Sequence, residues 1–290
     1  MIKFSLPGYI SHEPIIKFFY NMQKEHPEYF IENRIIDSAY DCPSHLIWNG
    51  GRIMWEYQNC TDIYRLIDSY HNLGLKLRHN CTNMFIQGTL LTDLQSNQYI
   101  EYCEYDNDSV VVYTPELASY IKTNYPKYNI TWSTTRGDQD INDINRMSKD
   151  DFIVLDYNHN HNYSLLAQLK YPQHVEILCA ENCISNCPNR KEHYKSMSLV
   201  QLRVPNAIES ECPYAKSQGL SNFYMDTLRQ DHAITNQDID NLYANYGIER
   251  FKLSGRVAPP YFIIEVILYY LIKPQYKDAL RQTALNMMYV

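Results

Sequence analysis

The sequence predicts an α/β protein with the (β/α)8 architecture of a TIM-type barrel. Three observations support this prediction: short strand-like runs alternate with helical patterns along most of the chain, these runs number eight, and each is apolar nearly throughout. Strands that are apolar on both faces are typical of parallel sheets covered by helices, and repeated strand–helix alternation favours a parallel sheet. No Gly/Ser/Pro-rich linker interrupts the chain, so we expect one domain over residues 1–290.

The expected elements follow in chain order. The strands are expected at residues 3–6, 34–40, 75–81, 109–113, 129–134, 152–157, 175–179 and 250–253. Helical patterns lie between them at 12–24, 62–72, 89–103, 115–124, 141–148, 164–170 and 236–246. Residues 196–231 depart from the alternation, and we expect an insertion after the seventh strand that forms a loop or lid. A last helix at 260–287 is expected to close the barrel from outside.

Composition bounds the class of protein. With 45% hydrophobic and 20% charged residues the chain is expected to be globular, and its net charge of −7 gives no bulk attraction to nucleic acid. The start of the chain lacks the pattern of a signal peptide. The apolar run at 261–272 is too short for a membrane span and contains Glu265, so a buried helix is expected. Eight cysteines without a secretion signal favour a reducing, cytoplasmic compartment, where clustered thiols indicate metal binding or catalysis.

Polar side chains recur where the strands end, which is where barrels of this kind carry out chemistry. Cys42 and residues 48–52 follow the second strand, Thr82 and Asn83 the third, and 133–136 the fifth. Asp156 ends the sixth strand, a cysteine-bearing loop follows the seventh, and 252–256 end the eighth. From these positions we predict substrate contacts for Asn49, Arg52, Asn83 and Asp156. Residues 49–52 also fit a tight turn that needs glycine at positive φ.

Three cysteines in polar loops, Cys183, Cys187 and Cys212, predict a shared metal site, since core packing explains them poorly. The fourth ligand is either Cys42, at the same barrel face, or the adjacent Cys179, which ends a strand; we favour Cys42. The spacing suits an iron–sulfur cluster held by converging loops at least as well as a structural zinc site. In contrast, Cys60, Cys81 and Cys103 are expected to be small buried hydrophobes.

Basic residues near these thiols are the candidates for catalysis. Arg190 and His193 lie one helical turn apart, directly after the cysteines, and a charged, solvated helix start is the alternative explanation for them. Lys252 and Arg256 follow the last strand, where they could orient an anionic substrate or pair with a neighbouring loop. The sequence contains no serine elbow, P-loop, dinucleotide fingerprint or H-E-x-x-H motif.

The stretch Gly247-Ile248-x-x-Phe251-Lys252-Leu253-x-Gly255-Arg256 resembles the late barrel segment of the collagenase-like peptidase family, family U thirty-two, which ends in Lys-Ile-Glu-Gly-Arg. The resemblance implies a TIM barrel and, as in several members, a four-cysteine [4Fe–4S] cluster. It also implies oxygen-independent hydroxylation of ubiquinone precursors or RNA bases, or peptidase activity. The chain departs from the family at Ser254, which replaces the glutamate, and in its cysteine spacing.

The leading functional hypothesis is therefore an iron–sulfur enzyme that performs redox modification, most simply hydroxylation, of a small molecule, nucleotide or RNA. An anionic substrate and an electron donor or acceptor protein are the expected partners, with no membrane. The alternative is a zinc-stabilised barrel that acts as a binding or scaffold module. Peptide hydrolysis ranks third, because no recognisable protease motif is present.

Overall fold

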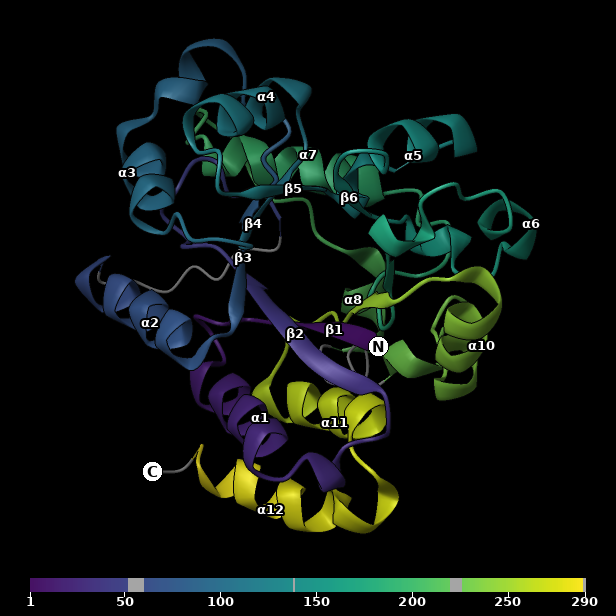
Figure 1. Cartoon of the computed structure of the whole chain (residues 1–290). Coiled ribbons are helices and arrows are strands. Elements are labelled where there is room, and N and C mark those ends of the chain that lie inside the picture. The colour runs from purple at the N-terminus through teal and green to yellow at the C-terminus, as the bar shows by residue number, and fades with distance from the viewer. Residues whose placement is uncertain (52–59, 138, 220–225, 289–290) are drawn as a thin grey trace.

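The protein forms a closed barrel of eight parallel strands in the order β1-β2-β3-β4-β5-β6-β7-β8, as a computed structural model shows (Figure 1). The structure describes residues 1–51, 60–137, 139–219 and 226–288. The circle closes where β1 (Ile2–Pro7) pairs in parallel with β8 (Arg250–Lys252). The predicted (β/α)8 fold is confirmed.

All eight predicted strands exist. The remaining six are β2 (Arg34–Asp41), β3 (Lys76–Cys81), β4 (Ser109–Val112), β5 (Asn129–Trp132), β6 (Phe152–Val154) and β7 (Val175–Leu178). β5 and β6 end before their predicted limits because short 3-10 helices start there. Ser133 caps η3 (Thr134–Arg136), and Asp156 caps η4 (Tyr157–His159), each accepting a hydrogen bond from a backbone amide two residues ahead.

Helices surround the barrel. They are α1 (Glu13–Glu25), α2 (Cys60–Leu73), α3 (Leu94–Tyr102), α4 (Pro115–Asn124), α5 (Ile141–Met147), α6 (Tyr163–Leu166), α7 (Arg190–Gln201), α8 (Pro213–Gln218), α10 (Asn236–Tyr246), α11 (Pro260–Leu271) and α12 (Lys277–Asn286). Further single turns of 3-10 helix are η1 (Pro27–Tyr29), η2 (Gly88–Thr92), η5 (Pro172–His174), η6 (Asp226–Arg229) and η7 (Pro274–Tyr276).

Two predicted helices are each divided. The helix expected at 89–103 becomes η2 and α3, because Asp93 accepts a hydrogen bond from the Ser96 amide and so starts a new helix. The helix expected at 260–287 breaks at Lys273, whose extended backbone precedes Pro274. In Figure 1, α12 consequently folds back beneath α11. Within the predicted insertion, residues 196–201 complete α7, and α8 and η6 follow.

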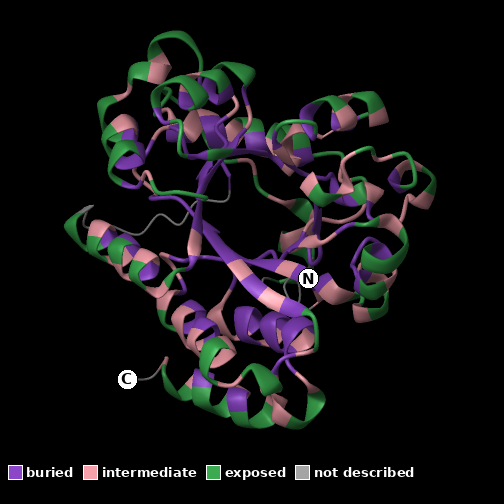
Figure 2. Ribbon diagram, in the orientation of Figure 1, coloured by how far each residue is buried: buried purple, intermediate pink, exposed green. Residues whose placement is uncertain are grey.

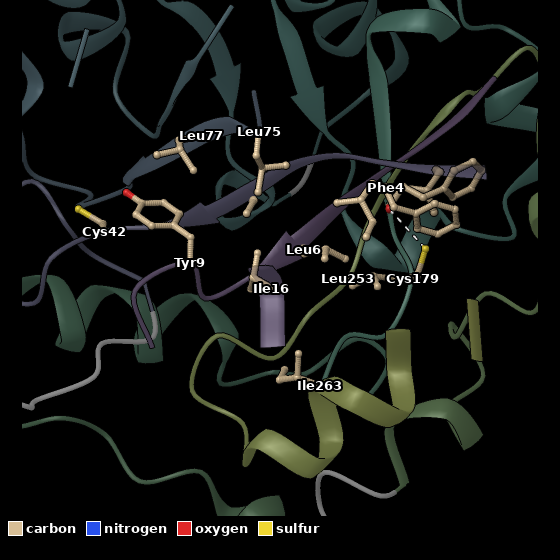
Figure 3. Close-up of a cluster of buried hydrophobic side chains, with 14 of the residues drawn as sticks. Phe4, Leu6, Tyr9, Ile16, Cys42, Leu75, Leu77, Cys179, Leu253 and Ile263 are labelled. Atoms are coloured by element: carbon tan, nitrogen blue, oxygen red, sulfur yellow. Dashed lines mark hydrogen bonds between the residues drawn. The ribbon is translucent and has the colours of Figure 1, made fainter. Parts of the chain in front are cut away.

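The apolar core lies between the sheet and the helices. Figure 2 shows buried strands inside a shell of helices whose outer faces are exposed. Phe4, Leu6, Leu77 and Leu253 belong to the same core cluster as Ile16 and Ile263 of the covering helices, and Figure 3 shows all six. The run predicted as a buried helix is α11, whose residues are mostly buried. No helix among the described residues has the length and apolar character to cross a membrane.

The inside of the barrel is unusually polar for a fold whose interior is commonly filled by branched apolar side chains. A cavity of about 180 Å³ at the amino-terminal end of the strands and another of about 80 Å³ at the carboxyl end are lined by alternate residues of the same strands. The first cavity meets Ser38, Arg78, Ser109, Thr131, Glu176 and Arg250; the second meets the residues two positions later, Tyr40, Asn80, Val111, Ser133, Leu178 and Lys252. This period of two identifies these side chains as the inward-facing set.

An ion pair crosses the barrel interior within the amino-terminal layer. Arg78 Nη1 of β3 donates to Glu176 Oε1 of β7 at 2.5 Å, and both side chains are buried. Arg78 Nη2 also donates to Thr131 Oγ1, whereas Glu176 Oε2 has no hydrogen-bond partner. The pair therefore fixes a negative and a positive charge beneath the mouth of the barrel.

Candidate functional site

A polar cavity occupies the mouth of the barrel, at the carboxyl ends of the strands. Its volume is about 80 Å³. Contributions come from β2, β3, β4, β7 and β8 and from the loops that follow β2, β3, β5, β7 and β8. The lining residues are Tyr40, Gly51, Asn80, Thr82, Val111, Ser133, Thr134, Thr135, Leu178, Glu181, Tyr194, Lys252, Ser254, Gly255 and Arg256. Two of the four predicted catalytic residues, Lys252 and Arg256, are thus brought together.

Lys252 is a buried cation of this cavity whose pKa is strongly lowered. Its side chain is only 7% exposed, and its ammonium lies 3.8 Å from the centre of the Tyr40 ring. It forms no hydrogen bond with any described residue. Burial lowers the pKa of Lys252 to about 7; the cations Arg78 and Arg256 act in the same direction, while Glu176 and Glu181 oppose them. A large fraction of this amine is therefore neutral near pH 7.

Arg256 supplies a second buried cation. It is 6% exposed, and its Nη1 lies 3.8 Å from Asp41 Oδ1, too far for a hydrogen bond. The reason lies in Asp41, whose Oδ1 accepts from the Cys42 amide and whose Oδ2 accepts from the amides of Ile10 and Ser11. The predicted alternative, a pair with a neighbouring loop, is therefore only partly realised. Donor capacity of the guanidinium remains available for a ligand.

Glycines lie next to Arg256 both in the sequence and in space. Gly255 has a φ of +128°, and a methyl group there would come within 2.5 Å of Ile263 Cδ1. A Cβ on Gly51 would lie 2.7 Å from Arg256 Nη2, and one on Gly50 only 2.2 Å from Asn83 Cα. The predicted positive φ at Gly50 and Gly51 is wrong, since neither glycine adopts it. Close approach between the loop after β2 and its neighbours is what requires glycine at these two positions.

Arg190 lies beside the cavity instead of in solvent. It is 9% exposed, and its guanidinium lies 4.5 Å from the Tyr157 ring centre and 5.1 Å from that of Tyr194. Its Nη1 also lies 3.5 Å from Glu181 Oε2. The alternative of a solvated helix start is wrong for this residue, because α7 begins with Arg190 turned inward. The Arg190 guanidinium balances the charge of Glu181, a cavity residue that the sequence does not predict.

The three loop cysteines line one pocket. Cys183, Cys187 and Cys212 surround a cavity of about 110 Å³ between the loop after β7, the start of α7 and the start of α8. Arg190, His193 and Tyr194 complete its wall, and Tyr194 also lines the mouth cavity. His193, a predicted catalytic residue, lines the thiol pocket and not the mouth cavity. Its Nε2 lies 3.7 Å from Glu209 Oε1. The Cys212 sulfur accepts a hydrogen bond from the Ala215 amide.

The thiols do not form a complete ligand set. No group of three His, Cys, Asp or Glu side chains among the described residues is arranged to hold a metal ion. Cys42, the favoured fourth ligand, does not line the thiol pocket; it is buried in the core next to Tyr9 and in contact with Cys81 (Figure 3). Cys179, the other candidate, lies on the far side of that core near Leu253. Neither residue supplies a fourth thiol to the pocket in this arrangement.

The predicted substrate contacts lie elsewhere. Asn49 donates to the carbonyls of Cys42 and Pro43, and Asn83 donates to those of Ile47 and Ser198, so both fix loops. Asp156 caps η4 and lines two cavities beside the mouth. None of the three lines the mouth cavity, and Arg52 lies outside the described residues. Cys81 and Cys103 are buried, as expected. The side chain of Cys60 lies outside the part of the chain that the structure describes.

The strand-end pattern does not predict several of the cavity residues. Tyr40 and Asn80 lie within strands, one or two residues before the polar loops that attract attention. Their signal was the period-two pattern, since each follows by two positions another inward-facing polar residue, Ser38 and Arg78. Strand ends alone therefore predict the cavity residues that lie in the loops but not those that lie within the strands.

Comparison with known proteins addresses the fold. No protein-family model matches the sequence, and no curated protein matches it. Among solved structures, that of the U32 peptidase Mk0906 is similar, with a TM-score of 0.52 and 13% identity over 89% of this chain and 94% of that one. The chain shares the fold of a U32 peptidase. At the level of fold, this confirms the resemblance seen in residues 247–256.

Proposed function

We propose that the chain is an enzyme that binds a small anionic substrate in the mouth cavity and acts on it through the Lys252 amine. One observation carries the proposal: the side chains of Lys252 and Arg256 are both buried and line the same cavity, and neither makes a hydrogen bond to a described residue, with Asp41 no nearer than 3.8 Å to Arg256 Nη1. Buried charges without partners are costly and rare in proteins. An anion in the cavity would satisfy both cations.

The two cations are suited to different roles. The planar guanidinium of Arg256 can hold a carboxylate or phosphate through two parallel hydrogen bonds. The Lys252 amine, with its pKa lowered to about 7 by burial, can accept a proton or attack a carbonyl carbon at neutral pH. Hydroxyl groups of Thr82, Ser133 and Ser254 around the cavity supply further hydrogen bonds to a polar substrate.

Cavity size favours a small molecule over a nucleotide or RNA as the group that is bound. The mouth cavity, of about 80 Å³, holds a group the size of several water molecules, which is much smaller than a nucleotide. The peptidase activity named for Mk0906 ranks lower for this chain. Ser254 lies two positions beyond Lys252, yet no hydroxyl in the cavity is hydrogen-bonded to that amine among the described residues, as a nucleophile and its base would be.

Chemical labelling tests the proposal without knowledge of the substrate. Folded protein is reductively methylated with formaldehyde and cyanoborohydride across a range of pH, and each lysine is followed by peptide mass spectrometry. Lys252 should reach half of its maximal rate near pH 7, and millimolar pyruvate or acetate should protect it, while the exposed Lys170 serves as the internal control. Labelling of Lys252 that rises only together with that of Lys170, or that no anion affects, would refute the proposal.

A redox centre in the thiol pocket is the second candidate. It is favoured by the convergence of Cys183, Cys187 and Cys212 on one pocket, which shares Tyr194 with the mouth cavity. We propose that an iron–sulfur cluster bound there would supply electrons for modification of the substrate, exchanged with a donor or acceptor protein in the cytoplasm. A zinc ion in the same pocket would leave the chain a stabilised binding module.

Metal analysis separates these possibilities. Anaerobically purified protein with about four irons per chain and broad absorbance in the visible range would support the cluster. Zinc at about one ion per chain in colourless protein would refute it. Cys183→Ser and Cys187→Ser should abolish metal retention, whereas the matched control Cys103→Ser, buried in the core, should leave it unchanged.

A further inference from the structure

We infer that Lys252 forms a covalent imine with a small 2-oxo acid whose carboxylate is held by Arg256. This inference rests on the proposed function and names the substrate class of the same site. Its basis is the arrangement of a buried primary amine and a buried guanidinium as neighbours on the wall of one small cavity.

The charge balance of the cavity calls for one negative charge that is not yet present. Glu181 is the one acidic residue among those that line it, and Arg190 lies 3.5 Å from that carboxylate. Asp41 beneath Arg256 accepts three backbone amide hydrogen bonds, so its charge is already stabilised. When Lys252 is protonated, or is joined to the substrate as an iminium, the cations Lys252, Arg256 and Arg190 outnumber Glu181 and Asp41 by one, and a monoanion restores the balance.

The amine has the features that imine formation needs. Its nitrogen must be neutral to attack a carbonyl carbon, and it must not be held in an ion pair. Lys252 rests on the Tyr40 ring at 3.8 Å, and no carboxylate lies within ion-pair distance of it among the described residues. Tyr40 is itself fixed, because its hydroxyl donates to the Leu253 carbonyl at 2.6 Å across the β2–β8 gap. The amine is thereby kept pointing into the cavity.

The covalent step balances without an outside oxidant or reductant. The Lys252 nitrogen attacks the keto carbon to give a carbinolamine; this intermediate loses the former keto oxygen as water, and a carbon–nitrogen double bond replaces the carbon–oxygen one. The departing water takes one proton from the amine and one from solvent, relayed by the hydroxyl groups of the cavity, and the nitrogen keeps its second proton in the iminium. The resulting iminium withdraws electrons from the adjacent carbon, whose proton then becomes acidic.

Size limits the acid to the smallest members of the class. A cavity of about 80 Å³ favours short acids such as glyoxylate, pyruvate and 2-oxobutyrate over the longer 2-oxoglutarate. A second carboxylate would also lack a cation, because the remaining lining residues are uncharged apart from Glu181. Hydroxyls of Thr82, Ser133 and Ser254 suit a short, polar chain.

Borohydride trapping tests the inference. Folded protein is incubated with pyruvate and reduced with sodium borohydride, and the carboxyethyl adduct is located by peptide mass spectrometry. We expect the adduct on Lys252 at least about tenfold above any other lysine, none in Lys252→Arg, and at least about a tenfold loss in Arg256→Gln, since a hydrogen bond to a charged group is lost. 2-Oxoglutarate and the uncharged ketone acetone should label Lys252 weakly.

The outcomes distinguish this inference from the proposed function. If pyruvate protects Lys252 from reductive methylation yet leaves no adduct after borohydride, the anion site stands and the imine is refuted. If pyruvate neither protects nor labels, both are refuted. Adducts spread evenly over the lysines also refute the imine. Arg256→Lys, which keeps a charge, serves as the second variant should Arg256→Gln fail to fold, and it should retain more labelling.

Discussion

The ion pair inside the barrel leads to a prediction about stability. Arg78→Met removes the only cation bonded to the Glu176 carboxylate among the described residues and leaves that carboxylate buried with one oxygen already unpartnered. Removal of one partner of a buried ion pair typically costs about 3–5 kcal/mol. Both side chains are less than a tenth exposed, so solvent cannot compensate. We expect the free energy of unfolding to fall by about that amount.

The double variant Arg78→Met with Glu176→Leu provides the decisive comparison. Replacement of both charges by apolar groups of similar size is often neutral or stabilising, so the double variant should lie within about 1 kcal/mol of the wild type. Glu176→Leu alone leaves Arg78 uncompensated and should be as destabilised as Arg78→Met. The coupling between the two sites should therefore reach at least about 5 kcal/mol in a double-mutant cycle.

Thermal unfolding followed by circular dichroism, with urea titration as a second measurement, provides the assay. The single variants should melt roughly 6–15 °C below the wild type, and the double variant close to it. Single variants that each lose less than about 1 kcal/mol, with effects that add in the double variant, would show that water enters the barrel and screens the pair. A second readout is the Lys252 titration: its pKa should rise in Arg78→Met, because the cation that lowers it has gone.

Three further predictions concern the site and its surroundings. Gly51→Ala should displace Arg256 and weaken pyruvate protection of Lys252 with little loss of stability, whereas Gly50→Ala, which meets Asn83 backbone, should lower the melting temperature; equal effects on both properties would contradict this. Lys252 is protonated in the unfolded chain but largely neutral in the folded one between about pH 7 and pH 10, so stability should rise with pH there by up to about 1.4 kcal/mol per unit, and Lys252→Met should flatten the curve. Burial lowers the pKa of His79 to about 3, so its contribution to stability is lost as pH falls from about 6.5 towards 3, and acid titration of His79→Gln should show a shallower decline.

The sequence revealed the barrel more completely than the site. Strand–helix alternation is a property of neighbouring residues, so all eight strands could be placed from local pattern alone. Breaks such as the one at Lys273–Pro274 depend on one residue inside a long apolar pattern, and they were missed. Site residues depend on which side chains meet across the barrel. Lys252 and Arg256 were found because they end a strand, whereas Glu181 was hidden among the more conspicuous cysteines of its loop.

Distance in the fold accounts for the remaining differences. Cys42 was chosen as a ligand because it follows the second strand, but its side chain turns outward into the core next to Tyr9. A position at a strand end fixes the backbone and not the direction of the side chain. Asn49 and Asn83 likewise lie at the carboxyl end of the barrel, yet their side-chain amides donate hydrogen bonds to loop carbonyls. Residue type and strand position together are therefore insufficient to identify contacts to a substrate.

Most strands have an outward apolar face and an inward face that is largely polar, and this division has a consequence for how the protein can change over time. Substitutions at Ser38, Asn80 or Ser133 alter what the barrel can bind while leaving the packing layer of Phe4, Leu77 and Phe251 intact. Selection for substrate binding and selection for stability thus act on alternate residues of the same strand. A barrel built in this way can acquire a new substrate by small steps without first losing its fold.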